Sequence, residues 1–523
     1  MAIKRAARAK GDHDGHIDFL GFAPDADLDI PGACSVMDGL MPTSRGWRAM
    51  PPLDRSENRF FHGTASYAFP LAQAWVSSSA LMFAHETAQT DLLTAAAASL
   101  GKIHRVYPYI TGVQTVIDTG TAGAIAVVAS KDVTGTSTPS GYVRGPQAVW
   151  CDFGGVIVAG GIGLSLYSTT GQTLTPIAAS PSSTTALVQA SRFLVNFDLS
   201  YGWRCCARDN ALSWTLSPAT LAAQGSLPGD NSYINRAAAA LGDDILLFKG
   251  NGVYRGAFVP GDAEVWKWRN LNLDVLALRG RCAAPYKQGV VVLAEDGLYY
   301  YDGASLINFM NKRMSLWFVR RVLALGGRNT IVVDEVRNLI WISVNMYDSD
   351  DVATYSKKTI VCDPESQRFA FWNGESIHDI FSGPHMYPSA WSGGKGDVRS
   401  GLRTVWGLPT TAPYIPREIA GVGTAAAAAI IVTNDFGDAF IDSELTRVGI
   451  KFTKSPTGTL PIATGMVRNN LDEALSTLAP VTRSPDGHFD VRQNSRWHRI
   501  KFDLRGDFEL AGYAPDMTLE GLR

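Results

Sequence analysis

The sequence predicts an all-β protein, namely a β-propeller with an additional antiparallel β platform module. The first observation is composition: the 523 residues include 51 Gly, 26 Pro, 13 Trp, 17 Tyr and 22 Phe, which is typical of short strands joined by tight turns. The second is spacing, because apolar strands recur about every 40 to 50 residues, as in four-stranded propeller blades. A tandem of β-sandwiches is the alternative fold, although its strand spacing would be shorter and more even.

The clearest repeats share one pattern: an apolar strand, a tight turn with glycine, and a second strand that carries an aromatic residue. Residues 245–254 and 291–300 both show it, with Asn-Gly and Asp-Gly between the strands. These dipeptides supply the positive φ that two-residue hairpins require. Both segments are therefore predicted to be hairpins.

Further strands and one helix follow from the same pattern. The best helical candidate is Lys312–Val322, and the alanine-rich residues 92–100 could be a strand or a short helix. Other strands are expected at residues 65–69, 74–78, 80–83, 124–129, 155–158, 164–167, 193–197, 338–343, 359–362 and 369–372.

Composition divides the chain into three regions: an extended basic arm and leader (1–54), a propeller of roughly six to eight blades (55–400), and an antiparallel β platform module (401–523). The leader is rich in turns and prolines, which remove amide donors, so it should lie along other structure and could complete the platform. The second boundary is placed near Ser400, after the glycine-rich residues 393–396.

In the last region, strands are expected at 448–452, 464–467, 489–491 and 497–504. Ile500, Phe502 and Leu504 alternate with charged residues in the last of these, as in a half-exposed antiparallel strand.

Charge and cysteine content bound the class of protein. A formal net charge of −2 argues against wholesale coating of nucleic acid, which relies on a basic surface. The longest apolar run, 425–432, is far shorter than the ~20 residues that span a bilayer, so we expect a soluble chain without a signal peptide. The six scattered cysteines are expected to be reduced and mostly buried, with a strained Cys205–Cys206 disulfide as the alternative.

We expect no catalytic, cofactor or metal site. Residues 207–214 faintly resemble the Asp-box turn of sialidases: Asp209 and Trp214 fit, whereas Ala207 and Ala211 depart from the pattern. Such boxes are structural turns, so the match does not predict catalysis.

Paired carboxylates could perform acid and base chemistry, but all lie at expected turns, where solvated acidic residues are the default. The group around Asp348 could hold Ca²⁺ through oxygen ligands, yet it lacks the glycine and distal glutamate of an EF-hand. The carboxylates considered are Asp243, Asp244, Glu295, Asp296, Asp334, Glu335, Asp348, Asp350 and Asp351.

The histidines do not cluster as metal ligands: His13 and His16 lack a third partner, and His62, His85 and His104 are widely spaced. No Walker loop, nucleophile elbow or zincin motif occurs. The glycines in residues 159–163 precede an expected strand, whereas a dinucleotide-binding loop precedes a helix. The chain is not expected to be an enzyme.

Three pieces of sequence resemble one family, the tail nozzle (distal tail tube) proteins of short-tailed phages. Ile30–Gly32 with Met37–Arg48 looks like the family's leader, and Asp209–Trp214 followed by Leu241–Lys249 is similar to one of its blades. The closing strands are similar at Arg492–Arg499, Gly506–Leu510 and Gly521–Arg523. The chain departs from the family pattern in the first blade, around residues 95–98.

The resemblance implies a structural virion protein that forms the distal nozzle ring of a short tail, channels DNA and docks fibres or spikes. Its implied partners are tail adaptor or portal-proximal ring proteins, identical subunits in a hexamer, and genomic DNA passing through the lumen. It would assemble in the host cytoplasm, and the purified chain would stay a monomer until it meets an adaptor. The alternatives are a carbohydrate-binding or carbohydrate-cleaving propeller and a cellular propeller scaffold.

Overall fold

The structure is a computed structural model. It describes residues 16–50 except 28–29, the strands 71–76, 81–86, 101–106 and 129–133, residues 148–384 with short gaps, 403–409, 417–418, and 428–519 except 457–459. The predicted basic arm (1–15), the strand at 65–69 and the alanine-rich residues 92–100 lie outside the described residues.

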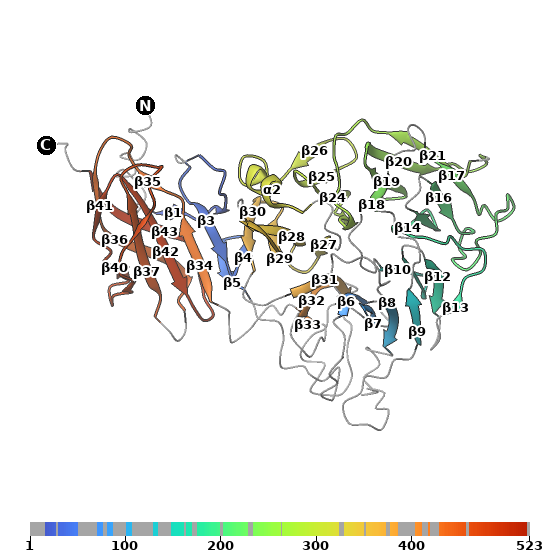
Figure 1. The fold of residues 1–523 in the computed structure, drawn as a ribbon, viewed down its shortest axis with the longest axis horizontal. Coiled ribbons are helices and arrows are strands. Elements are labelled where there is room, and N and C mark those ends of the chain that lie inside the picture. Colours follow the sequence, from blue (N-terminus) through green and yellow to red (C-terminus); the bar gives the residue numbers. More distant parts are fainter. Residues whose placement is uncertain are drawn as a thin grey trace, which may run out of the picture.

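The described strands between Leu71 and Glu418 form seven blades of consecutive, antiparallel strands (Figure 1). The first four blades are β6 (Leu71–Val76), β7 (Leu81–Glu86), β8 (Gly101–Val106), β9 (Ala129–Val133); β10 (Ala148–Phe153), β11 (Val156–Gly161), β12 (Leu164–Thr169), β13 (Thr175–Pro176); β14 (Ala186–Ala190), β15 (Phe193–Phe197), β16 (Gly202–Cys205), β17 (Gln224–Ser226); and β18 (Asn235–Leu241), β19 (Asp244–Lys249), β20 (Gly252–Phe258), β21 (Trp266–Asn270). The last three are β23 (Ala283–Tyr286), β24 (Gly289–Ala294), β25 (Gly297–Tyr301), β26 (Leu306–Asn308); β27 (Asn329–Asp334), β28 (Leu339–Ser349), β29 (Val352–Asp363), β30 (Arg368–Phe371), with β22 (Gly280–Arg281) beside β27; and β31 (Ile377–Pro384), β32 (Arg403–Pro409), β33 (Arg417–Glu418).

The first strands of successive blades lie side by side from β10 through β14, β18, β23 and β27 to β31. Strand β31 in turn contacts β6, which brings the last blade beside the first. The predicted all-β propeller class is therefore confirmed, and its seven blades fall within the expected six to eight. The alternative of tandem sandwiches is wrong.

The boundary expected near Ser400 is wrong because it cuts through a blade. Residues 377–384 pair with 403–409 in one antiparallel hairpin, so the propeller extends to Glu418. The glycine-rich residues 393–396 lie between these two strands in the sequence, outside the described residues.

The two predicted hairpins are confirmed, with a shift of one position at each turn. Lys249 pairs with Gly252, and Ala294 pairs with Gly297, so each glycine is the first paired residue after the turn. Gly252 has a φ of +140°, which an L side chain rarely adopts. The glycine therefore sets the return of the chain into the second strand, and the turn itself is formed by the two preceding residues.

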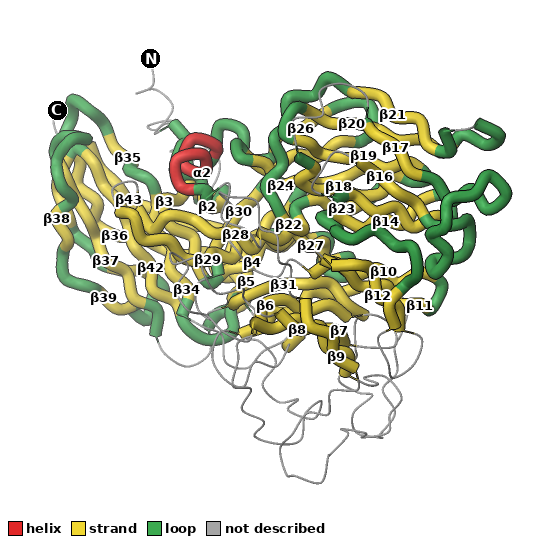
Figure 2. Tube along the Cα trace, turned by 45° about the vertical axis from the view of Figure 1, so that its right-hand side comes forward, coloured by secondary structure: helices red, strands yellow, loops and turns green. Residues whose placement is uncertain are grey.

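The described strands of the platform form two facing sheets (Figure 2). One contains β1 (Ile17–Asp18), β4 (Leu40–Thr43), β5 (Gly46–Ala49), β36 (Ser443–Lys454), β40 (His488–Phe489), β41 (Gln493–Ser495) and β43 (Glu509–Leu519). The other contains β2 (Gly21–Phe22), β3 (Ala33–Asp38), β34 (Ala429–Thr433), β35 (Phe436–Gly437), β37 (Ile462–Arg468), β38 (Ser476–Thr477), β39 (Val481–Thr482) and β42 (Trp497–Leu504). Phe502 of β42 lies 6.3 Å from Tyr513 of β43, ring centre to ring centre, so aromatic side chains fill the space between the sheets. The predicted alternation in β42 is confirmed, since Ile500, Phe502 and Leu504 are fully buried.

The leader joins the propeller to the platform. Its strand β3 pairs antiparallel with β34 on one edge and in parallel with β30 of the sixth blade on the other, so a single sheet runs through both bodies. Strand β1 and the β4–β5 hairpin pair with β43. A leader that lies along other structure was expected, and here it contributes strands to both platform sheets.

A shared hydrophobic core accompanies this joint. Phe22 of the leader packs edge-on against Phe371 of β30, with 4.6 Å between ring centres, and against Trp317. Trp317 belongs to α2 (Ser315–Arg321), the one helix in the described part of the chain, which lies within the predicted Lys312–Val322. The Asp25 carboxylate of the leader accepts the backbone N–H of Trp317 at 3.0 Å and so ties the leader to the first turn of α2. No helix among the described residues is long and apolar enough to cross a membrane.

Candidate interaction surface

The strands nearest the propeller axis carry small, unreactive side chains in the central blades. Strand β18 runs Asn-Arg-Ala-Ala-Ala-Ala-Leu, and β14 begins and ends with alanine. Ala237 and Ala239 are buried, which lets neighbouring blades approach closely. The side chain of alanine has no group that can donate, accept or attack, so the alanine positions of these two strands offer no chemistry.

The predicted carboxylate pairs are largely engaged in local ion pairs. Asp244 accepts two bonds from the Arg255 guanidinium at 2.5 and 2.6 Å, and Glu295 pairs with Arg236 of the neighbouring blade. The first contact connects two strands of one blade and the second connects two blades, so both carboxylates have a structural role.

For Asp334, the expectation that the paired carboxylates are solvated is wrong. Its side chain is fully buried, where it accepts a bond from the Arg337 guanidinium at 2.7 Å and two backbone N–H groups at 3.1 Å each. These donors replace water and compensate the cost of burying the charge. Asp334 therefore closes the turn between β27 and β28.

The group around Asp348 does not form a cation site in the described part of the chain. Asp348 pairs with Lys358 at 3.1 Å and accepts the Ser356 hydroxyl, while Asp350 and Asp351 lie outside the described residues. No three His, Cys, Asp or Glu side chains come together as metal ligands among the residues that the structure describes.

The turn from Asp209 to Trp214 is built as a structural element. Trp214 is fully buried between the second and third blades, and its indole N–H donates to the carbonyl of Ala211 at 2.7 Å. Asp209 has a φ of +63° and pairs with Arg192 at 2.5 Å. The turn thus belongs to the connection between β16 and β17 of the third blade and packs it against the second blade, in agreement with the structural interpretation of this segment.

The six cysteines are free thiols, so the Cys205–Cys206 disulfide is ruled out. Five are buried and Cys151 is half-buried. Burial raises the pKa of Cys205 to about 11 and that of Cys206 to about 12, so neither is a thiolate at neutral pH.

Two of the described histidines, His16 and His498, have local side-chain partners. His16 contacts Asp18 at 2.9 Å. His498 is buried between the platform sheets, where it contacts the Ser443 hydroxyl at 2.8 Å and the Gln493 amide at 3.1 Å. Burial lowers the pKa of His498, so the ring is neutral and links the two sheets. His13 and His62, and the side chains of His85 and His104, lie outside the described residues.

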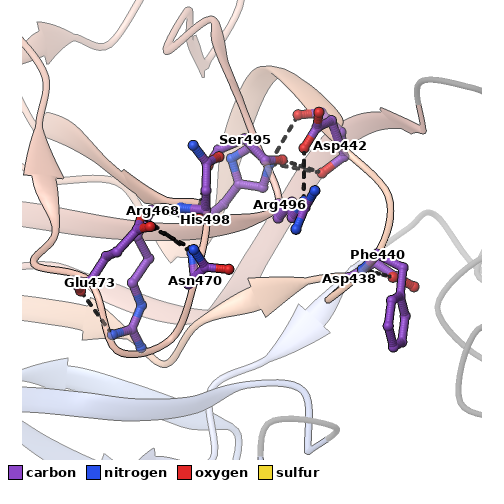
Figure 3. A network of polar contacts seen from close by, with 11 residues as sticks. Asp438, Phe440, Asp442, Arg468, Asn470, Glu473, Ser495, Arg496 and His498 are labelled. Atoms are coloured by element: carbon purple, nitrogen blue, oxygen red, sulfur yellow. Dashed lines mark hydrogen bonds and ion pairs between the residues drawn. The ribbon is translucent and has the colours of Figure 1, made fainter.

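A polar network at one end of the platform organises the loop between β35 and β36 (Figure 3). At its base the Asp435 carboxylate is almost completely buried, and one of its oxygens accepts bonds from Arg468 and Arg499 at 2.6 Å each. Nearby, the Ser495 hydroxyl donates to the carbonyl of Arg468 at 2.7 Å. These bonds fix the ends of β37, β41 and β42 relative to one another.

On this base, residues 438–442 form what we call the Phe440 turn. The backbone N–H of Asp438 donates to the carbonyl of Arg496 at 3.0 Å, and the Asp438 carboxylate accepts the N–H of Phe440 at 2.7 Å. On the other side of the turn, Asp442 pairs with Arg496 at 3.4 Å. The Phe440 side chain is nonetheless 83% exposed, and Figure 3 shows its ring pointing away from the network. A fixed turn that holds a phenylalanine in water suits a contact with another molecule.

A second exposed apolar feature lies on α2. Leu316 is 63% and Val319 50% exposed, and their spacing of three residues places them on one side of the helix; we call this pair the α2 face. Arg320 and Arg321 follow in the last turn, where the Arg321 guanidinium lies 5.0 Å from the centre of the Trp317 ring.

Neither feature was predicted from the sequence. Asp438-Ala-Phe-Ile-Asp442 contains an aromatic residue between two acidic ones, and that is the local signal that could have indicated a presented side chain. In α2 the pattern predicts a helix but does not show which of its apolar residues stay uncovered.

The sequence matches no protein-family model and no curated protein. Several solved structures match this chain at low sequence identity and low TM-score. The structure of U3-55K is 10% identical, with a TM-score of 0.34 over 70% of this chain and 97% of that one. A chain of the mitotic checkpoint complex is 11% identical, with a TM-score of 0.34 over 72% and 95%. The β-propeller domain of the trilobed protease from Pyrococcus furiosus is 9% identical, with a TM-score of 0.31 over 67% and 98%.

Proposed function

We propose that this chain is a structural virion protein that forms the distal nozzle ring of a short phage tail. In this role it channels the genome during ejection and docks fibres or spikes. Its partners are a tail adaptor or portal-proximal ring, identical subunits in a hexamer, and DNA that passes through the lumen.

The observation that carries the proposal is the joint formed by β3. A strand that pairs with the propeller on one edge and with the platform on the other makes the two bodies one sheet with one core. A subunit of a ring around a channel must keep its shape under load, and a sheet and core shared by the two bodies would make the subunit rigid. The same leader carries part of the resemblance to tail nozzle proteins, in Ile30–Gly32 and Met37–Arg48.

The engaged carboxylates support a scaffold in preference to an enzyme. Asp244, Glu295, Asp334 and Asp348 each hold a local partner, and the turn at Trp214 fills space between blades. A propeller of this kind can serve as a rigid platform for display.

Imaging of assembled particles tests the proposal. We expect copies of the chain to form a ring around an axial channel at the distal end of a short tail, and an antibody against the platform to label that end. A chain that is absent from particles, or that is a stable monomer cleaving host polysaccharide, would show the proposal to be wrong.

A further inference from the structure

The Phe440 turn and the α2 face are both uncovered in the single chain. The two cannot be satisfying each other within one molecule, because Phe440 is 83% and Leu316 63% exposed. Single surface leucines are common and need no explanation, but a phenylalanine held outward by a turn that is fixed at both ends is a different feature.

The two features carry opposite charge. Asp438 and Asp442 flank Phe440, and Arg496 pairs with only the second of them. Around the α2 face the segment 312–321 contains Lys and Arg residues and no acidic residue, and the Asp25 carboxylate at the first turn of the helix accepts the backbone N–H of Trp317. Aromatic and aliphatic side chains surrounded by complementary charge are the usual elements of a specific contact, in which the charges select the partner and the apolar centre supplies most of the affinity.

We propose that the Phe440 turn of one copy docks on the α2 face of a second copy, with the phenyl ring packing against Leu316 and Val319. The inference rests on the proposed function, because it supplies the contact between neighbouring subunits of the ring. The two surfaces differ, so the contact is heterologous and joins copies head to tail. Repetition of such a contact closes into a ring when the rotation allows it.

The position of α2 determines which parts of two neighbouring subunits the proposed contact would connect. The helix is held by Asp25 of the leader and packs through Trp317 on Phe371 of the sixth blade. The Phe440 turn belongs to the platform. Each contact would therefore connect the platform of one subunit to the joint between platform and propeller of the next.

The apolar centre of this contact is small. One phenylalanine on two aliphatic side chains buries much less than the roughly 800 Å² per partner of a stable interface. The contact is thus a central anchor, which agrees with the expectation that the purified chain stays monomeric until an adaptor gathers several copies.

Cross-linking between two differently tagged copies tests the contact directly. One copy carries Ala439→Cys, next to the intact Phe440, and the other carries Ser315→Cys, next to Leu316. In the matched control, the second copy carries Ser213→Cys instead of Ser315→Cys. Ser213 is half-buried and lies on the third blade, next to Leu212, whose side chain is exposed like that of Leu316. All are mixed at high protein concentration with a short bismaleimide, whose irreversible reaction accumulates a weak complex. Mixed wild-type copies measure the background from native thiols.

We expect the Ala439→Cys and Ser315→Cys copies to give at least about tenfold more mixed dimer than the control pair. Adding Phe440→Asp to the first copy, or Val319→Asp to the second, should reduce the yield to the control level. High salt should also reduce it, because exposed charges are screened. Both aspartate changes are at exposed positions, and an unchanged circular dichroism spectrum shows that each variant is folded.

A mixed yield equal to that of the control, or one that Phe440→Asp leaves unchanged, would overturn the inference. A dominant product between two Ala439→Cys copies would also overturn it, because that product indicates a symmetric contact. The same holds if the thiol introduced by Ala439→Cys is protected by an adaptor or fibre protein and not by a second copy of this chain. If particles show the ring while the cross-link fails, the contact is wrong and the proposed function stands. If the cross-link forms while no particle contains a ring of this chain, the contact stands and the proposed function is wrong.

Discussion

Replacing Asp435 with alanine should strongly destabilise the end of the platform, where β37 and β42 are held together. Its carboxylate is 2% exposed and accepts bonds from Arg468 and Arg499, which are themselves only 15% and 20% exposed. Without the carboxylate two guanidinium groups of like charge remain together with little water. Breaking a buried ion pair by removing one partner costs about 3–5 kcal/mol.

The matched control is Asp442→Ala in the same module. That carboxylate pairs with Arg496 at 3.4 Å, and the two side chains are 55% and 40% exposed. Exposed ion pairs contribute about 0–1 kcal/mol, so the two substitutions separate the effect of burial from the effect of removing an aspartate.

Hydrogen exchange of the β37 and β42 amides measures the difference, because a chain with two bodies need not unfold in one step. A loss of about 3 kcal/mol corresponds to exchange roughly a hundredfold faster in Asp435→Ala. Asp442→Ala should change it by about fivefold or less. Asp435→Asn should retain most of the loss, since an amide leaves both positive charges uncompensated. Equal effects of Asp435→Ala and Asp442→Ala would refute the reasoning.

Three further predictions concern the core, pH and the leader. Trp214→Ala should destabilise the third blade by about 3–5 kcal/mol, seen as faster amide exchange in β15, because it empties a fully buried site; protection equal to wild type would contradict this. Burial lowers the folded-state pKa of His498 below its ordinary 6.5, so the unfolded chain binds the proton first and platform stability should fall as pH drops below about 6.5; His498→Gln should remove that dependence in thermal unfolding followed against pH. Gly512→Ala would place a Cβ 2.0 Å from the carbonyl oxygen of Ile17 and should release the leader to proteolysis, whereas Gly202→Ala, with its nearest neighbour at 3.4 Å, should not; equal cleavage of the two variants would refute the assignment.

The sequence predicted the blades well because a blade is a local structure. Strand, turn and returning strand follow one another within a few tens of residues, so hairpins such as 245–254 are visible in the pattern of apolar residues and glycine. The helix at Ser315–Arg321 was found for the same reason. Its Leu316 and Val319 show the limit, because periodicity indicates a helix but not which apolar residues remain in water.

Pairings between distant segments could not be predicted. Asp38 pairs with Phe371, and Val36 with Val432, across hundreds of residues, and no local pattern in β3 specifies either partner. The misplaced boundary near Ser400 has the same origin: a glycine-rich segment between two strands of a hairpin resembles a segment between two domains. Asp334 was expected in solvent because its place in a turn is local information, whereas its burial comes from the strands packed around it.

The joint at β3 also constrains how the molecule could change shape. Tilting the propeller against the platform would break the pairing of β3 with β30 and expose the aromatic contact between Phe22 and Phe371. It would also pull Asp25 from the first turn of α2. Each of these losses uncovers apolar surface or leaves backbone groups unpaired, so such a tilt is costly. The proposed contact between copies would bury less surface than the joint and would depend on exposed charges, so it would be weaker than the joint. If a ring of this chain opens to let DNA pass, we therefore expect the movement to occur between subunits, with the propeller and platform of each subunit moving together.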